Sequence, residues 1–355
     1  MSLQSLETIA TKLVADGKGI LASDETVGTI TRRFEQLKIP STPESRRDYR
    51  ELLLATPGSA AFISGVIMYD ETIRQHASGG KRLIDVLLNQ GIVPGIKVDT
   101  GAKPLAGSEQ ETVTEGLDGL RERLKDYRTI GAQFAKWRAV IRITDELPSQ
   151  TCVNANAHAL GRYAALCQEQ GMVPIVEPEV LMEGAHTIGR CSAVTSDVLN
   201  AVLNALHENR VMLEGMLLKP NMIVSGSLCP TQASVTEVAD VTLRCLLRHV
   251  PAAVPGIVFL SGGQSDVVAT EHLNAINGRA AIKPWKLSFS YGRALQDLAL
   301  ATWLGDGRNR EAAQRAYYHR AKCNAAASIG KYSAAMENEF KGETARRHRS
   351  DREDD

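Results

Sequence analysis

The segment LEGMLLKPNM, from Leu213 to Met222, is apolar up to a single lysine, Lys219, which a proline follows at once. We interpret it as a buried β-strand that ends at Lys219, because proline cannot continue the pairing of an internal strand. Lysine is rarely buried without a partner, since its charge must leave water. The segment therefore predicts a strand with a reactive or paired lysine at its carboxyl end.

Seven other apolar runs alternate with segments of helical periodicity along the chain. Continuous apolar strands that alternate with helices are typical of a parallel sheet buried on both faces. Eight such units favour a closed (β/α)8 TIM barrel of the α/β class, and 355 residues is close to the size of one barrel or of two ordinary domains. The eight runs are GKGILASD, FISGVIMYD, VPGIKVD, FAKWRAVI, MVPIVEPEV, MLEGMLLKP, GIVFLSGG and KLSFSYG.

The end of the chain differs in composition from the rest. From Glu337 onward it is dense in charge and nearly free of apolar residues. This composition predicts a single barrel domain over residues 1–336 and a solvated tail over residues 337–355. The basic cluster from Arg346 to Arg349 could contact an anion, although the acidic residues after it disfavour nucleic acid.

The overall composition excludes several classes of protein. The 41 basic and 41 acidic side chains cancel, which argues against a nucleic-acid partner held by phosphate contacts. No apolar run approaches the roughly 20 residues that span a bilayer, and the N-terminus has the pattern of an amphipathic helix rather than of a signal peptide. We expect a cytoplasmic protein without a membrane partner. The six cysteines and eight histidines form no metal-binding motif, so we expect no metal.

Charged side chains fall where the predicted strands end. In this fold the chemistry lies at the carboxyl ends of the strands. A single lysine there is as well explained by a structural ion pair or by a side chain that reaches back to water. Three lysines that converge with carboxylates predict a functional site. The residues are Asp24 after the first run, Lys97 in the third, Lys136 and Arg138 in the fourth, Glu177 and Glu179 in the fifth, and Lys219 in the sixth.

This set of side chains suits one chemistry. Partial burial and a like-charged neighbour lower the pKa of a lysine and make a neutral amine available. Such an amine attacks a carbonyl to give a Schiff base, and a glutamate can move the protons that dehydration requires. An aspartate can take a proton from a substrate hydroxyl while a carbon–carbon bond breaks. We therefore expect aldol cleavage of a ketose without a cofactor.

The last two runs end in glycine-rich loops that suit a phosphate group. Glycines let backbone N–H groups approach an anion, and the loops after these two strands often form a phosphate site in this fold. Arginine offers a planar fork to phosphate oxygens, although glycines also form turns. The residues are Ser261, Gly262, Gly263, Ser290, Gly292 and Arg293. Lys97, Arg33 and Arg138 could hold a second phosphate, while Arg33 beside Arg32 is also typical of a solvated helix face.

Eight segments together resemble the class I, Schiff-base fructose-1,6-bisphosphate aldolases from about Leu3 to Tyr332. The resemblance implies that Lys219 forms the Schiff base and that Glu177, supported by Glu179, is its acid and base. The segments are GKGILASDETVGTI, GIKVDTGAKPLAG, ETVTEGLDGL, GAQFAKWRAV, VPIVEPEV, LEGMLLKPNM, FLSGGQS and SFSYGRALQ.

The resemblance assigns the other positions too. It implies that Lys136 stabilises charge beside the imine and that Asp24 acts near the cleaved bond. Ser261, Gly262 and Arg293 match contacts to the phosphate nearer the imine. Lys97 and Arg138 match positions at the other end of the substrate, where Thr29 and Arg32 replace the serine and lysine typical of animal members.

The implied activity is the reversible cleavage of fructose 1,6-bisphosphate to glycerone phosphate and glyceraldehyde 3-phosphate, by an enzyme that is commonly a homotetramer. One departure is that many members end in a tyrosine that assists proton transfer. This chain ends in Asp355, and its last tyrosine is Tyr332.

A transaldolase is the nearest alternative enzyme, but the two predicted phosphate sites argue against it because a transaldolase handles one phosphate at a time. The alternative of a different class is a phosphate-binding scaffold without catalytic activity. The complete set of lysine, glutamate and aspartate disfavours it.

Overall fold

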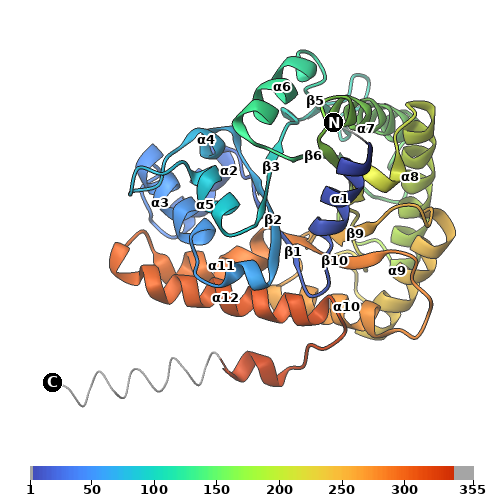
Figure 1. Ribbon diagram of the computed structural model, residues 1–355. Coiled ribbons are helices and arrows are strands. Elements are labelled where there is room, and N and C mark those ends of the chain that lie inside the picture. The colour runs from blue at the N-terminus through green and yellow to red at the C-terminus, as the bar shows by residue number, and fades with distance from the viewer. Residues whose placement is uncertain (1–2, 340–355) are drawn as a thin grey trace.

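The computed structural model describes residues 3–339, in which eight parallel strands close into a barrel. Figure 1 looks along this barrel and shows the helices around it. The strand order is β1-β10-β9-β8-β7-β6-β3-β2, so the predicted (β/α)8 barrel is confirmed. The barrel strands are β1 (Gly19–Ser23), β2 (Ile63–Met68), β3 (Val93–Lys97), β6 (Phe134–Ile141), β7 (Val173–Val180), β8 (Leu217–Leu218), β9 (Gly256–Phe259) and β10 (Lys286–Tyr291).

The helices cover the barrel on the outside and close one of its ends. Within residues 3–339, three single turns of 3-10 helix join the longer elements: η1 (Ser59–Ala61), η2 (Leu213–Gly215) and η3 (Gly307–Asn309). The α-helices are α1 (Leu3–Leu13), α2 (Val27–Gln36), α3 (Pro43–Leu54), α4 (Asp70–Arg74), α5 (Leu83–Asn89), α6 (Leu120–Ile130), α7 (Gln150–Glu169), α8 (Ile188–Glu208), α9 (Val235–His249), α10 (Asp266–Gly278), α11 (Arg293–Trp303) and α12 (Arg310–Ala327).

Each predicted run contributes one barrel strand, but the run that contains Lys219 is shorter than expected. Its first residues form η2, and only Leu217 and Leu218 are strand. The reason is a side chain from α7: Gln168 donates to the backbone oxygen of Met212 at 2.7 Å and accepts from its N–H at 2.9 Å. These bonds use backbone groups that a longer strand would pair. The N–H of Lys219 still donates to the oxygen of Val176 at 2.8 Å.

The amino-terminal half of the barrel is filled with apolar side chains. Leu6 and Leu13 of α1 pack into this end against inward residues such as Phe134 and Val173. Gly95 makes room for Phe134, because a Cβ at this glycine would lie 2.2 Å from the ring. Since helix and ring occupy this half, the polar side chains of the strands gather at the other end.

The pleat of β6 separates its charged residues from its aromatic one. Side chains alternate along a strand, so Lys136 and Arg138 point into the barrel as predicted. Trp137 points outward and packs 5.6 Å from the ring of Tyr163 on α7. The two faces of this strand thus differ as the alternation predicts.

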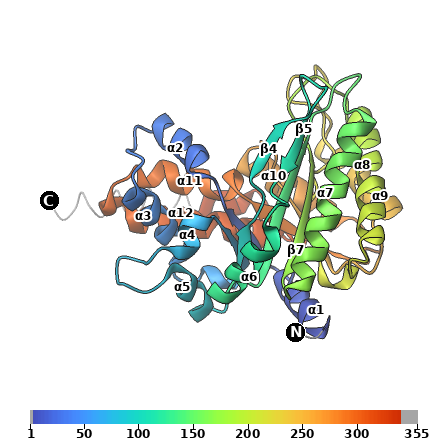
Figure 2. The same cartoon turned by 90° about the horizontal axis from the view of Figure 1, so that it is seen from above.

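An antiparallel hairpin that we did not predict follows β3. It consists of β4 (Gly101–Pro104) and β5 (Thr112–Glu115), and Figure 2 shows it at the end of the barrel opposite α1. The hydroxyl of Thr114 donates to the oxygen of Arg138 at 2.8 Å. The hairpin therefore stands beside the carboxyl ends of the strands.

The carboxyl-terminal segment stays attached to α12 as far as it is described. Residues 335–339 are helical, and Glu337 accepts from Arg320 at 2.6 and 2.7 Å and from the hydroxyl of Tyr332 at 2.9 Å. The rest of the predicted tail, including Arg346 to Arg349, lies outside the described residues.

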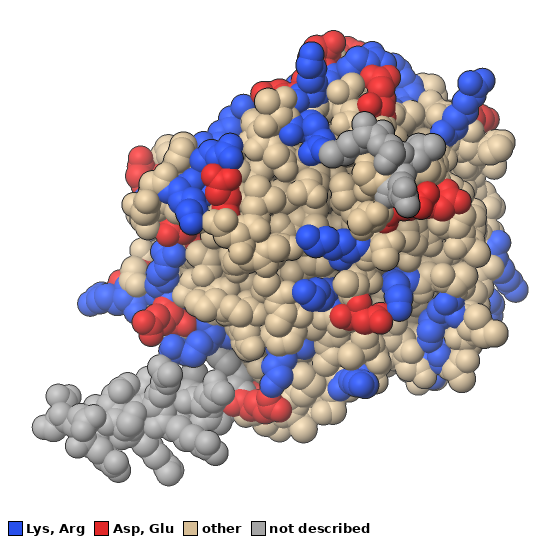
Figure 3. All heavy atoms as spheres, in the orientation of Figure 1, with Lys and Arg blue, Asp and Glu red and all other residues tan. Residues whose placement is uncertain are grey.

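Two surface features bear on partners. No helix within residues 3–339 is long and apolar enough to cross a membrane. On the face around α1, lysine and arginine side chains are scattered among acidic and uncharged ones (Figure 3). The described residues of this face form no continuous basic stripe of the kind that follows a nucleic-acid backbone.

Candidate active site

Lys136 lies at the centre of a buried cluster of charges at the carboxyl ends of the strands. Its Nζ is 2.7 Å from Asp24 after β1, 3.3 Å from Glu177 on β7 and 4.0 Å from Asp99 after β3. Only 4% of the lysine side chain is exposed. Four separate segments of the barrel thus bring one cation and three carboxylates together.

Lys219 joins this cluster through Glu177. The Nζ of Lys219 is 3.1 Å from Oε1 of Glu177, and both side chains are 4% exposed. The other oxygen, Oε2, faces Lys136 but makes no hydrogen bond among the described residues. Glu177 therefore lies between two lysines, with one carboxylate oxygen towards each.

Burial and charge act against each other on the ionisation of these groups. Burial alone would raise the pKa of Asp24, but the nearby ammonium of Lys136 outweighs it and lowers this pKa to about 2. Burial alone would lower the pKa of Lys136, but the carboxylates of Asp24, Glu177 and Asp99 raise it above its ordinary value. At neutral pH, Asp24 is ionised and Lys136 is charged.

A second acidic and basic pair stands nearer the mouth of the barrel. Glu179 accepts from Nε of Arg138, whose side chain is 42% exposed. The in-register partner of Arg138 on β7 is Glu177. Arg138 thus pairs with Glu179, one pleat further along β7 than its in-register partner, and Glu177 is left to the two lysines of the cluster.

The glycine-rich loop after β9 has a backbone that its sequence requires. Gly262 and Gly263 have φ angles of +59° and +105°, which favour glycine. A Cβ at Gly262 would also lie 2.3 Å from Cε of Met182. Ser261 precedes these glycines and is buried.

The end of β10 stands beside this loop. Arg293, the first residue of α11 after Gly292, is exposed and reaches within 3.6 Å of the position that a Cβ would take at Gly263. The hydroxyl of Ser290 is buried and has no hydrogen-bond partner among the described residues. The predicted residues of the first phosphate site thus lie on adjoining loops.

The residues predicted for a second phosphate are engaged with other partners. Arg33 pairs with Glu25 and, at 2.8 Å, with Asp297. Lys97 donates to the backbone oxygen of Asp99 at 2.9 Å and also contacts its carboxylate. Both cations therefore already have a carboxylate as counter-ion.

The amino-terminus of α2 offers a different group of donors. The hydroxyl of Thr29 lies 3.1 Å from the hydroxyl of Thr26. Arg32 donates to the hydroxyl of Thr29 at 3.5 Å. The start of a helix favours anions. We did not predict Thr26 as a site residue, although a threonine that caps a helix is a signal for one.

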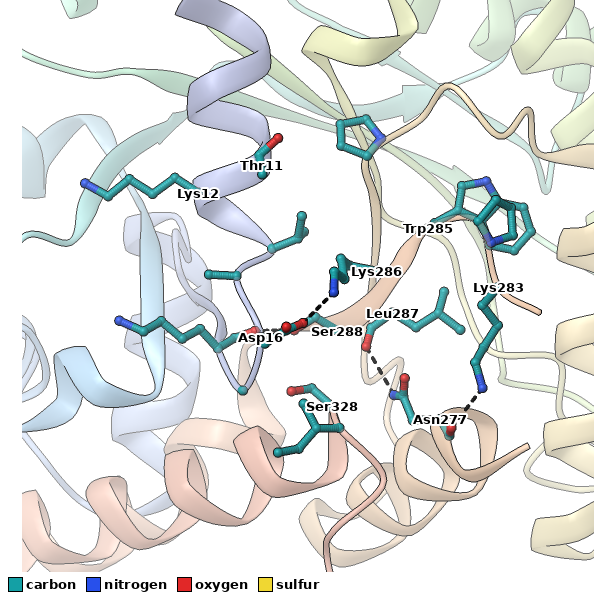
Figure 4. Close-up of a pocket in the computed structure, with 17 residues that line it drawn as sticks. Thr11, Lys12, Asp16, Asn277, Lys283, Trp285, Lys286, Leu287, Ser288 and Ser328 are labelled. Carbon is teal, nitrogen blue, oxygen red and sulfur yellow. Dashed lines mark hydrogen bonds and ion pairs between the residues drawn. The ribbon is translucent and has the colours of Figure 1, made fainter. Parts of the chain in front are cut away.

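The end of the barrel around α1 has a pocket of about 730 Å³, but none of the predicted site residues line it. Figure 4 shows that two of its lysines, Lys283 and Lys286, already have partners. Lys286 lies 2.7 Å from Asp16, and Lys283 donates to the oxygen of Asn277 at 2.8 Å. The chemistry suggested by the strand ends therefore belongs to the opposite face.

One group of possible metal ligands occurs among the described residues, away from the strand ends. The ligand atoms of His319, Cys323 and Glu337 lie within 4.8 Å of one another. Both oxygens of Glu337 already accept from Arg320, which leaves a guanidinium where a metal ion would need room.

Comparisons with known proteins agree on one family. Residues 5–351 match the family model for fructose-bisphosphate aldolase class-I. The chain is 55% identical over 333 residues to a probable fructose-bisphosphate aldolase class 1 of Xanthomonas campestris pv. campestris, which covers 94% of this chain and 99% of that protein. It is 51% identical over 330 residues to human fructose-bisphosphate aldolase B, with 93% and 91% covered.

A solved structure agrees with the sequence comparisons. The fructose-bisphosphate aldolase of Plasmodium falciparum, crystallised with TRAP and a small-molecule inhibitor, matches with a TM-score of 0.92 and 46% identity over 93% of this chain and 96% of that one. The chain belongs to the family of class I fructose-bisphosphate aldolases.

Proposed function

We propose that this enzyme, a class I fructose-bisphosphate aldolase and therefore a lyase, works through a Schiff base on Lys219. The observation that carries the proposal is that Lys219 and Lys136 lie 3.1 and 3.3 Å from the two oxygens of one buried carboxylate, that of Glu177. A proton held by Glu177 is within reach of an adduct on Lys219, and Lys136 supplies a fixed positive charge beside it.

The steps follow from this arrangement. The neutral amine of Lys219 attacks the ketose carbonyl, and Glu177 protonates the hydroxyl that leaves as water, which gives a protonated imine. Asp24 takes the proton of the hydroxyl on the carbon beyond the bond to be broken. That bond then cleaves, its electrons move into the imine to form an enamine, and the aldehyde product leaves. Proton return and hydrolysis free the second product and Lys219.

The substrate we propose is fructose 1,6-bisphosphate, with one phosphate at each end of the cluster. The phosphate near the imine would meet the loop of Ser261 and Gly262 and the guanidinium of Arg293. Arg293 supports this because no carboxylate among the described residues lies within 4.0 Å of it. Thr29 and Arg32, at the start of α2, would meet the other phosphate.

Two groups predicted for the distal phosphate already pair with carboxylates. Arg33 would have to exchange Asp297 for the phosphate, and Lys97 would share its ammonium group between Asp99 and the phosphate, so we assign them a weaker part than Thr29 and Arg32. The homotetramer and the cytoplasmic location expected from the sequence stay predictions.

Steady-state cleavage of fructose 1,6-bisphosphate by two matched variants tests the proposal. Lys219→Arg keeps a charge but no nucleophilic amine, and we expect it to lose cleavage. Lys283→Arg is the control, because burial lowers the pKa of Lys283 but this lysine lines the pocket at the opposite end. Equal activity of both variants would contradict the proposal.

A further inference from the structure

Asp99 is a buried carboxylate at the end of β3 that the reaction described above does not use. Its side chain is 3% exposed, and it faces two lysines, Lys97 on its own segment and Lys136 on β6. These lysines are directly in register on neighbouring strands. Two ammonium groups so placed repel each other unless an anion lies between them.

The backbone fixes the position of this carboxylate. Oδ1 accepts from the N–H of Gly101 at 3.2 Å, and Oδ2 accepts from the N–H of Arg138 at 3.2 Å. Asp99 is therefore tied both to the start of the β4–β5 hairpin and to β6, the strand that carries Lys136. A carboxylate held in this way can define where its two cations lie.

We infer that Asp99 is a positioning residue for the cleavage reaction: its carboxylate is the shared counter-ion that holds Lys97 and Lys136 in register so that both act on one substrate. The inference rests on the proposed function, in which Lys136 stands beside the imine. It differs from an ordinary structural ion pair because both lysines reach the same site from adjoining strands.

The charges around Lys97 support this role. Burial and the charge of Lys136 lower the pKa of Lys97, while Asp99 and, further off, Asp24 on β1 oppose them. The neighbouring β2 has no titratable side chain, and Arg123 of α6 contacts only backbone oxygens here. Without Asp99, Lys97 loses the charge that opposes burial and Lys136, so its pKa falls and it loses its proton at a lower pH.

The experiment compares Asp99→Asn, Lys97→Met and the double variant. We expect Asp99→Asn to lower kcat/KM for the bisphosphate by roughly a hundredfold, since misplacing a reacting group by about 1 Å costs this much. Its KM should begin to rise at a lower pH than that of the unaltered enzyme. This pH shift should be absent for a ketose 1-phosphate, which lacks the distal phosphate.

The double variant is the stricter test. Removing Lys97 together with the charge of Asp99 relieves the repulsion on Lys136, so kcat should be higher in the double variant than in Asp99→Asn. Thermal melting should show the same order if Asp99→Asn folds poorly. A double variant no better than Asp99→Asn in either measurement, or unchanged pH dependence of KM, overturns the inference.

One further measurement separates this inference from the proposed function. Borohydride reduction of the unaltered enzyme with substrate shows whether a Schiff base forms. If it forms and Asp99→Asn behaves like the unaltered enzyme, only the role of Asp99 is wrong. If no adduct forms, the proposed mechanism itself is wrong, and the assignment of Asp99 falls with it.

Discussion

Replacing Lys136 by methionine removes the cation on which Asp24 depends. The pKa of Asp24 is about 2, against an ordinary value of 3.8, a difference that corresponds to about 2 kcal/mol of stabilisation in this largely buried pair. Because the folded-state pKa is lowered, this stabilisation is present above about pH 4 and is lost as the pH falls towards 2. We expect Lys136→Met to lower the free energy of unfolding at pH 7 by at least this amount.

The same change should alter the pH dependence of stability and activity. With Lys136 absent, burial is opposed only by the charges of Lys219 and Lys97, so the pKa of Asp24 should rise. Unfolding in urea should then show a smaller loss of stability between about pH 4 and 2 through this group. The acid limb of kcat/KM should move to higher pH, because Asp24 must be ionised to accept a proton. Lys136→Arg keeps the charge and is the control. If Lys136→Met has the pH dependence of the unaltered enzyme, the coupling described here is wrong.

Three other predictions follow from the site. Arg293→Ala should raise KM for the bisphosphate about ten- to a hundredfold, since a charge-assisted hydrogen bond is worth about 1.5–3 kcal/mol; an equal rise with a non-phosphorylated ketose would make Arg293 structural. Cleavage should survive a metal chelator, and a loss that zinc restores would show that the imine chemistry is wrong. Deleting residues 340–355 keeps the ion pair between Glu337 and Arg320. The deletion should leave the cleavage rate within a few-fold of that of the full chain and deuterium exchange into glycerone phosphate nearly unchanged. A collapse of exchange alone would make the tail a catalytic lid.

The sequence located the barrel well because its signal is local. Each apolar run is long enough to be recognised, and a lysine such as Lys219 inside one stands out. The hairpin of β4 and β5 was missed because β4 is mostly exposed and neither strand carries an apolar alternation. The short β8 was overestimated because the bond from Gln168 to Met212 joins residues 44 apart in the chain.

The partners of the charged residues were the harder part of the site. The sequence places Arg33 beside Arg32, but only the folded chain shows that Asp297, from α11, pairs with Arg33. Asp99 is visible at a strand end, yet its place between two lysines depends on the register of β3 and β6. Long-range electrostatic pairs of this kind depend on topology, which a local pattern does not contain.

The measurement that tests the central claim most directly is borohydride trapping with fructose 1,6-bisphosphate, followed by peptide mass spectrometry. The account predicts one reduced adduct per chain, on Lys219, lost in Lys219→Arg and kept in Lys283→Arg. An adduct on another lysine, or full turnover without any adduct, would contradict it.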